Sequence, residues 1–189
     1  MGAVDRFSEK GIVLKDGTEM EADMVVFGTG FTKSYDYFDE ATQKALDKQK
    51  DGLYLYRQLI PPNVPNLAFV GAEMSTFNNI LTQALQTLWL EKVLTKEMNL
   101  PEKEVMLDRV EEEKAWKRSW MPANGSRAAI FQLHKTKYHD QLCKDMGVSH
   151  RRKGMNPLAE AFAPYCARDY EDLFSRDKEE QIKGQPKKV

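Results

Sequence analysis

Two short apolar runs, each closed by glycine, constrain the fold of this chain more than any other feature. Residues 22–27 form an apolar run with one acidic residue, followed by Gly28-Thr29-Gly30. Residues 67–70 form a second run, followed by Gly71-Ala72-Glu73. Such runs are typical of strands buried on both faces of a parallel sheet. Glycine at the carboxyl end of such a strand marks a place where a ligand can approach the backbone, although a simple tight turn explains the same residues.

A helical pattern follows the second apolar run. Apolar residues recur at helical spacing from Ile80 to Leu94, and Asn78 or Asn79 is a candidate N-cap. The order of strand, glycine turn, polar loop and helix predicts free N–H groups and a positive dipole end beside the turn. These groups suit the electron-rich edge of a ligand. An ordinary strand-to-helix connection is the alternative interpretation.

The first residues predict a β-hairpin. A short β-rich run at 11–14 is followed by Asp16-Gly17, a dipeptide that favours a type I′ turn. The partner strand is expected at 18–21.

Charge and cysteine content exclude several classes of protein. The net charge is -1 over 189 residues, which excludes a strongly basic nucleic-acid binder. No apolar run approaches the roughly 18 residues that span a bilayer, and no signal peptide is visible. Cys143 and Cys166 form no CxxC or Cys/His pattern, so we expect neither a metal site nor a disulfide framework. These features predict a cytoplasmic protein.

The second half of the chain reads as helical. Apolar spacing predicts the following helices: 102–120, 126–146, 156–165 and 168–174. Trp116 and Trp120 fall on the first of them, where packing is the favoured role and contact with a substrate is the alternative. His134 and His139 are five residues apart, which is wrong for a metal-binding pair on one helix face, so we expect surface or capping roles. Arg151-Arg152-Lys153 indicates a solvated loop, with contact to a phosphate or an acidic partner as the alternative.

Four motifs in a fixed order carry a resemblance to a known family. They are the strand and glycine turn of Asp23–Phe31, the P-N-L-A-F-V-G of Pro65–Gly71, the pair Gln86 and Trp89, and Tyr138–Leu142 followed by Met146-Gly147. Together they resemble the carboxy-terminal portion of the flavin-containing monooxygenase family. Gly28 stands where that family usually has Ala, and Leu88 stands where it has an Arg, so any anchoring role of that Arg is absent.

The resemblance implies the fold class α/β, with an incomplete FAD/NAD(P)-binding domain of the two-dinucleotide-binding, Rossmann-like kind followed by a helical carboxy-terminal extension. The expected parts are 1–100 for the FAD/NADPH-binding portion, 101–177 for the helical extension packed on it, and 178–189 for a disordered tail. Matched residue by residue, the resemblance implies these flavin-side positions: Gly28, Thr29, Gly30, Phe31, Gly71, Ala72, Glu73, Asn78, Asn79 and Gln86.

The same resemblance implies the chemistry. Members of the family use FAD, NADPH and O₂ to oxygenate small molecules with a nucleophilic N or S, through a flavin C4a-hydroperoxide. No catalytic residue is identified, because the family's active-site Asn has no counterpart in this stretch. A Baeyer–Villiger-type or other flavin oxidoreductase is a second interpretation. A non-catalytic helical interaction protein is a third.

The sequence also lacks part of what this chemistry needs. Neither of the two GxGxxG motifs that hold the FAD and NADPH pyrophosphates is present. We therefore expect the chain to be a fragment that is inactive alone. A sheet without its first strands would have an unpaired edge, which favours self-association.

Overall fold

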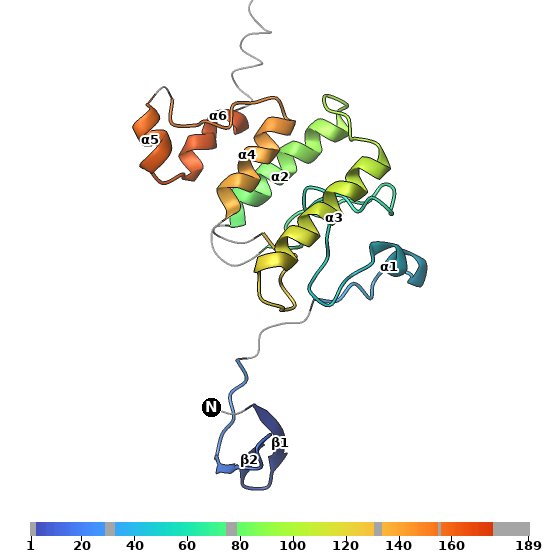
Figure 1. The fold of residues 1–189 in the computed structure, drawn as a ribbon, viewed down its shortest axis with the longest axis vertical. Helices are drawn as coiled ribbons and strands as arrows, with labels where there is room; N and C mark the ends of the chain where they lie inside the picture. The colour runs from blue at the N-terminus through green and yellow to red at the C-terminus, as the bar shows by residue number, and fades with distance from the viewer. Residues whose placement is uncertain (1–2, 29–32, 75–78, 131–133, 155, 176–189) are drawn as a thin grey trace, which may run out of the picture. The chain divides into compact units, whose positions relative to one another are not determined.

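The computed structural model describes residues 3–28, 33–74, 79–130, 134–154 and 156–175. The chain divides into two compact units, Met1–Asp36 and Tyr37–Val189, which are described separately (Figure 1). Four predicted positions fall outside the described residues: Thr29, Gly30, Phe31 and Asn78, together with the predicted tail 178–189. No helix in the described ranges is both long and apolar enough to cross a membrane.

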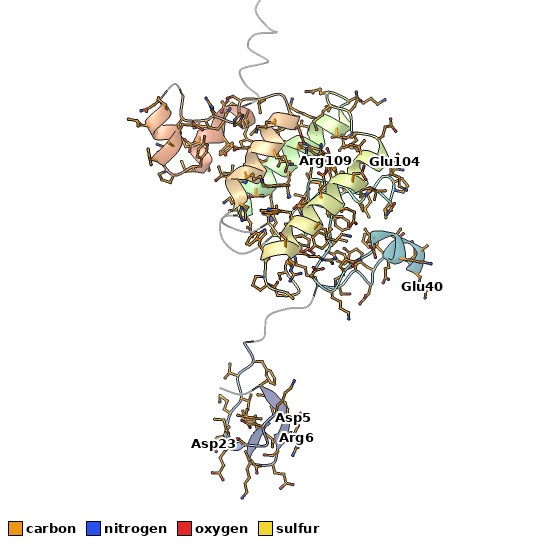
Figure 2. The ribbon with its side chains drawn as sticks, in the orientation of Figure 1. Asp5, Arg6, Asp23, Glu40, Glu104 and Arg109 are labelled. Atoms are coloured by element: carbon orange, nitrogen blue, oxygen red, sulfur yellow. The ribbon has the colours of Figure 1, made fainter. Side chains whose placement is uncertain are left out.

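The first unit is a three-stranded antiparallel sheet in the order β1 (Val4–Ser8), β2 (Gly11–Leu14) and β3 (Glu19–Glu21), and Figure 2 labels Asp5 and Arg6 of β1. The predicted hairpin is therefore confirmed, but its turn is not of type I′. Gly17 has a positive φ of 85° and Asp16 does not, whereas a type I′ turn needs both. The Gly17 N–H donates to the Leu14 carbonyl over 2.9 Å, as in a three-residue turn closed by a left-handed glycine.

The two predicted parallel strands are wrong as elements of this structure. Residues 22–27 are irregular, and the side chains of Met24 and Val26 are 80% and 83% exposed. Residues 67–70 are also irregular, and the Phe69 N–H donates to the Leu59 carbonyl over 2.8 Å. An apolar run forms a buried strand only when neighbouring strands pair with it on both sides. Among the described residues, parallel pairing is confined to one isolated bridge, Met74 with Ile130.

The second unit is helical (Figure 1). Its helices are α1 (Glu40–Leu46), α2 (Asn79–Leu94), α3 (Lys103–Trp120), α4 (Lys135–Asp145), α5 (Pro157–Phe162) and α6 (Glu171–Phe174), with a 3₁₀ turn η2 (Ala167–Tyr170) before α6. The helices predicted at 80–94 and 102–120 are confirmed, as are the short closing ones. The helix predicted over 126–146 begins only at Lys135, because Ile130 instead bridges to Met74. Helix α1 was not predicted.

One hydrophobic core joins α2, α3 and α4. It contains Leu85 and Trp89 of α2, Val110 of α3 and Leu142 of α4, all nearly or fully buried. Helices α2 and α4 pack directly on each other. The segment 53–60 contributes Tyr54, Tyr56, Leu59 and Ile60 to the same core. Residues on either side of position 100 therefore share one core.

Candidate functional site

The predicted glycine turn is built around Gly71. Its φ is 74°, in the left-handed region, and a Cβ added there would lie 2.7 Å from the Gln83 side-chain nitrogen. Both features favour glycine. The Gly71 N–H donates to the side-chain oxygen of Gln86 over 2.9 Å, so the turn is fastened to α2. The structure therefore brings Gly71 and Gln86, two of the predicted residues, into contact.

Gln86 is the centre of a chain of buried hydrogen bonds. Its side chain is fully buried, and its amide Nε2 donates to the Tyr138 hydroxyl over 2.9 Å. The Tyr138 hydroxyl in turn donates to the Arg57 carbonyl over 2.7 Å. Burial raises the pKa of Tyr138, so this phenol stays protonated and able to donate. These hydrogen bonds thus hold the glycine turn, α4 and the loop at Arg57 together.

The other predicted residues each have different surroundings. Glu73 is 1% exposed, and its carboxylate accepts from the Leu53 N–H over 3.3 Å. Ala72 is half-buried, and Asn79 is the first residue of α2. Gly28 belongs to the first unit, is exposed, and would meet nothing within 4 Å if it carried a Cβ. Within the second unit, the geometry therefore groups the glycine turn with α2.

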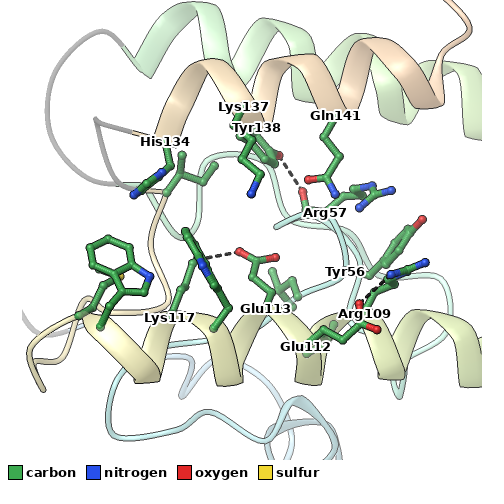
Figure 3. A pocket seen from close by; sticks show the side chains of 16 residues that line it. Tyr56, Arg57, Arg109, Glu112, Glu113, Lys117, His134, Lys137, Tyr138 and Gln141 are labelled. Carbon is green, nitrogen blue, oxygen red and sulfur yellow. Dashed lines mark hydrogen bonds and ion pairs between the residues drawn. The ribbon is translucent and has the colours of Figure 1, made fainter.

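A pocket of about 480 Å³ lies between α3 and α4. Figure 3 shows Lys137 and Tyr138 from α4 facing Glu113 and Lys117 from α3 across it. Its apolar lining includes Leu55, Val110, Met121 and Ile130. Sequence reasoning favoured packing for Trp116 and Trp120, but both line this pocket and are 40% and 44% exposed.

Arg57, which lines the pocket, is held by Asp145, and we refer to this pair as the clamp. The Arg57 guanidinium donates twice to Asp145, over 2.6 Å and 3.0 Å, and the Trp89 indole N–H donates to the same carboxylate over 3.1 Å. Arg57 and Gln58 both have left-handed backbones, with φ of 52° and 55°. No pattern in the sequence pointed to these residues, because neither is a glycine or an asparagine, the usual signals of such a turn.

A second buried polar contact joins α2 to α4. The hydroxyl of Thr82 lies 2.9 Å from the Nε2 of His139, and the His139 side chain is 2% exposed. Burial, with a smaller contribution from Lys135, lowers the pKa of His139 to about 4. The expected surface role for this histidine is therefore wrong, and it is neutral at neutral pH.

Comparison with known proteins gives a consistent result. A family model described as flavin-binding monooxygenase-like matches residues 1–152. The probable flavin-containing monooxygenase 1 of Arabidopsis thaliana is 36% identical over 182 residues, covering 92% of this chain and 32% of that protein. A human protein named putative dimethylaniline monooxygenase [N-oxide-forming] 6 is 34% identical over 113 residues, covering 58% of this chain and 20% of that protein.

A solved structure has a similar fold. S-allyl-L-cysteine S-oxygenase from Allium sativum matches with a TM-score of 0.62 and 21% identity, covering 95% of this chain and 43% of that chain. The chain therefore spans less than half of the solved structure, and a third or less of these two relatives.

Proposed function

Because the chain belongs to the flavin-binding monooxygenase-like family, we propose that it supplies part of the FAD/NAD(P)-binding, Rossmann-like domain of a flavin-dependent monooxygenase. The proposed enzyme uses FAD, NADPH and O₂ to oxygenate small molecules with a nucleophilic N or S, and it acts in the cytoplasm. The names of two similar proteins, an S-oxygenase and an N-oxide-forming monooxygenase, support this substrate class. A bound flavin would supply the redox chemistry that activates O₂.

The observation that carries the proposal is the buried network behind the glycine turn. Gly71 is held against α2 by Gln86, and the first turn of α2 has no acidic side chain. A helix start without carboxylates suits an electron-rich ligand edge. In this respect the N–H groups of the first turn of α2 suit a flavin. Gln86 acts as a positioning residue, because both ends of its amide are already paired.

The proposed flavin-side positions are those predicted from the sequence. They are Gly28, Thr29, Gly30, Phe31, Gly71, Ala72, Glu73, Asn78, Asn79 and Gln86. Since the sequence has no GxGxxG motif, the FAD diphosphate needs residues other than these. We therefore propose that this chain contacts the ring system and does not turn over substrate alone.

Flavin fluorescence tests the proposal directly. Titrating the chain into riboflavin and into FAD is expected to quench both, with FAD bound no more tightly than riboflavin. Gly71→Ala is expected to weaken the binding of both. Gly147→Ala is the matched control, because Gly147 also has a left-handed φ, of 70°, and nothing lies within 4 Å of its Cβ position.

The outcomes separate the alternatives. No quenching of either flavin would contradict the flavin-side proposal and favour a non-catalytic interaction protein. NADPH oxidation by the chain alone, supplied with FAD, would contradict its inactivity as a fragment.

We also propose that the chain self-associates through a sheet edge. Strands β1 and β3 each pair on one side only within the described part of the first unit. Strand β3 carries Glu19 and Glu21, whose like charges oppose antiparallel pairing with a second β3. Strand β1 carries Asp5 and Arg6, with Phe7 56% exposed, so β1 is the edge that suits a second copy.

A further inference from the structure

Three aromatic rings form one end of the pocket between α3 and α4. The rings of Trp116 and Trp120 lie 5.3 Å apart, and each lies 5.1 Å from the ring of His134, all measured between centroids. We refer to Trp116, Trp120 and His134 as the aromatic corner. Exposed indole rings beside an apolar wall provide a surface on which a planar apolar group can stack.

Among the described residues that line the pocket, Lys137 is a cation without a carboxylate partner. Arg57 is paired with Asp145, Arg109 with Glu112 over 2.7 Å, and Lys117 with Glu113 over 2.8 Å. Lys137 lies over the Trp116 ring, 5.1 Å from its centroid, and no ion pair joins it to a carboxylate of the described residues.

The charges that line the pocket determine whether it favours an anionic or a cationic ligand. Because an ammonium group already lies over Trp116, a second cation on that ring would be repelled. A carboxylate placed near Lys137 would instead be attracted, and the two carboxylates of the lining, Glu112 and Glu113, are both engaged with their own cations.

The wall opposite the aromatic corner is held in a strained shape. Two consecutive left-handed residues, neither of them glycine, are energetically unfavourable. Arg57 and Gln58 have this conformation, and the Arg57–Asp145 clamp and the Tyr138 hydrogen bond hold it. Strain of this kind is retained where it keeps a surface in a defined shape, and here it places Tyr56 and Arg57 on the pocket wall.

We propose that this pocket is a binding site for small planar aromatic carboxylates. The aromatic corner and the apolar lining take the ring, and Lys137 takes the carboxylate. No described flavin-side residue is among those that line the pocket, and its occupation does not depend on the proposed monooxygenase function.

Calorimetric titration of the full chain without flavin tests the proposal. The probes are 2-naphthoate, its neutral amide 2-naphthamide, and the cation 2-naphthylmethylammonium. We expect 2-naphthoate to bind roughly tenfold more tightly than the amide, in line with one charge-assisted hydrogen bond, and the cation to bind least well.

Two variants assign the roles. Lys137→Gln is expected to remove the preference for the acid over the amide while leaving the amide affinity unchanged. Lys144→Gln is the matched control, because Lys144 is exposed on the same helix and does not line the pocket. Trp116→Leu is expected to weaken the acid and the amide severalfold and equally.

Defined results would overturn the proposal. They are equal binding of the three probes, no binding of 2-naphthoate, or a preference for the acid that survives in Lys137→Gln. Riboflavin is expected to leave the affinity for 2-naphthoate unchanged, and competition between the two would show that the pocket is not a separate site.

Discussion

Gln86 holds three parts of the second unit together through one side chain. Its amide accepts from Gly71 and donates to Tyr138, and it is fully buried. Gln86→Ala is therefore expected to lower the free energy of unfolding by about 3 kcal/mol, because the partly buried Gly71 N–H loses its acceptor and the buried Tyr138 hydroxyl loses one of its two partners. Urea denaturation measures the change. Gln83→Ala, one turn earlier on the exposed side of α2, is expected to cost less than about 1 kcal/mol, and equal losses would contradict the argument.

His139 makes the stability of the fold depend on pH. Burial lowers its pKa in the folded chain from 6.5 to about 4, so the unfolded state binds the proton more readily between these values. The contribution of neutral His139 is complete above about pH 6.5 and is lost as the pH falls towards about 4. We expect the free energy of unfolding to fall by about 2–3 kcal/mol from this group between about pH 7 and about pH 4.5.

Denaturation curves of His139→Gln provide the comparison. The glutamine variant does not titrate, so its stability should change less over the same pH range. If both proteins lost the same stability, His139 would not be the responsible group.

At the scale of elements, the clamp between Arg57 and Asp145 joins a loop to the end of α4. The Arg57 and Asp145 side chains are 16% and 19% exposed, so removing the carboxylate charge leaves a largely buried guanidinium unpaired. Asp145→Asn is expected to cost about 3 kcal/mol of stability, measured by urea denaturation.

An exposed ion pair is the control for this change. Glu112→Gln removes the same charge from a pair whose side chains, Arg109 and Glu112, are 60% and 63% exposed. It is expected to cost less than about 1 kcal/mol. A cost for Glu112→Gln as large as that for Asp145→Asn would show that burial of the clamp does not determine its contribution.

Elements with a long periodic pattern were predictable, and those that depend on distant neighbours were not. Helices α2 and α3 follow from apolar residues that recur at helical spacing over 16 and 18 residues. The runs at 22–27 and 67–70 have the composition of strands, but composition does not supply the strands that must pair with them. Helix α1 has only seven residues, with Asp39 accepting from the Thr42 N–H over 2.8 Å, and is too short for a periodic signal.

Part of the candidate site was predictable from the sequence, and part was not. The glycine turn and Gln86 followed from the order of motifs along the chain. The pocket did not, because Arg57, Lys137 and Trp116 lie far apart in sequence and meet only through tertiary packing. Nothing in the local sequence around Arg57 and Lys137 indicates that their side chains line the same pocket.

At the scale of the whole molecule, the proposed pairing of β1 predicts a mass that depends on concentration. Sedimentation equilibrium is expected to show a weight-average mass above 21.8 kDa that rises with protein concentration. Arg6→Glu places two carboxylates side by side on the edge strand and is expected to shift the chain towards monomer.

Lys10→Glu is the matched control for self-association. It makes the same charge change at an exposed residue of the turn between β1 and β2, outside both strands. A monomer at every concentration for the unmodified chain would contradict the pairing of β1. Equal effects of the two substitutions would show that net charge, and not the strand edge, controls association.

The placement of the three tryptophans gives the molecule two distinct optical signals. Trp89 is 1% exposed in the core, whereas Trp116 and Trp120 are 40% and 44% exposed beside the ring of His134. A collisional quencher such as acrylamide would therefore reach two indoles and spare the third, giving a downward-curving Stern–Volmer plot. The residual blue-shifted emission would follow the integrity of the core, and the quenchable fraction would follow the carboxyl-terminal half of α3, without any added label.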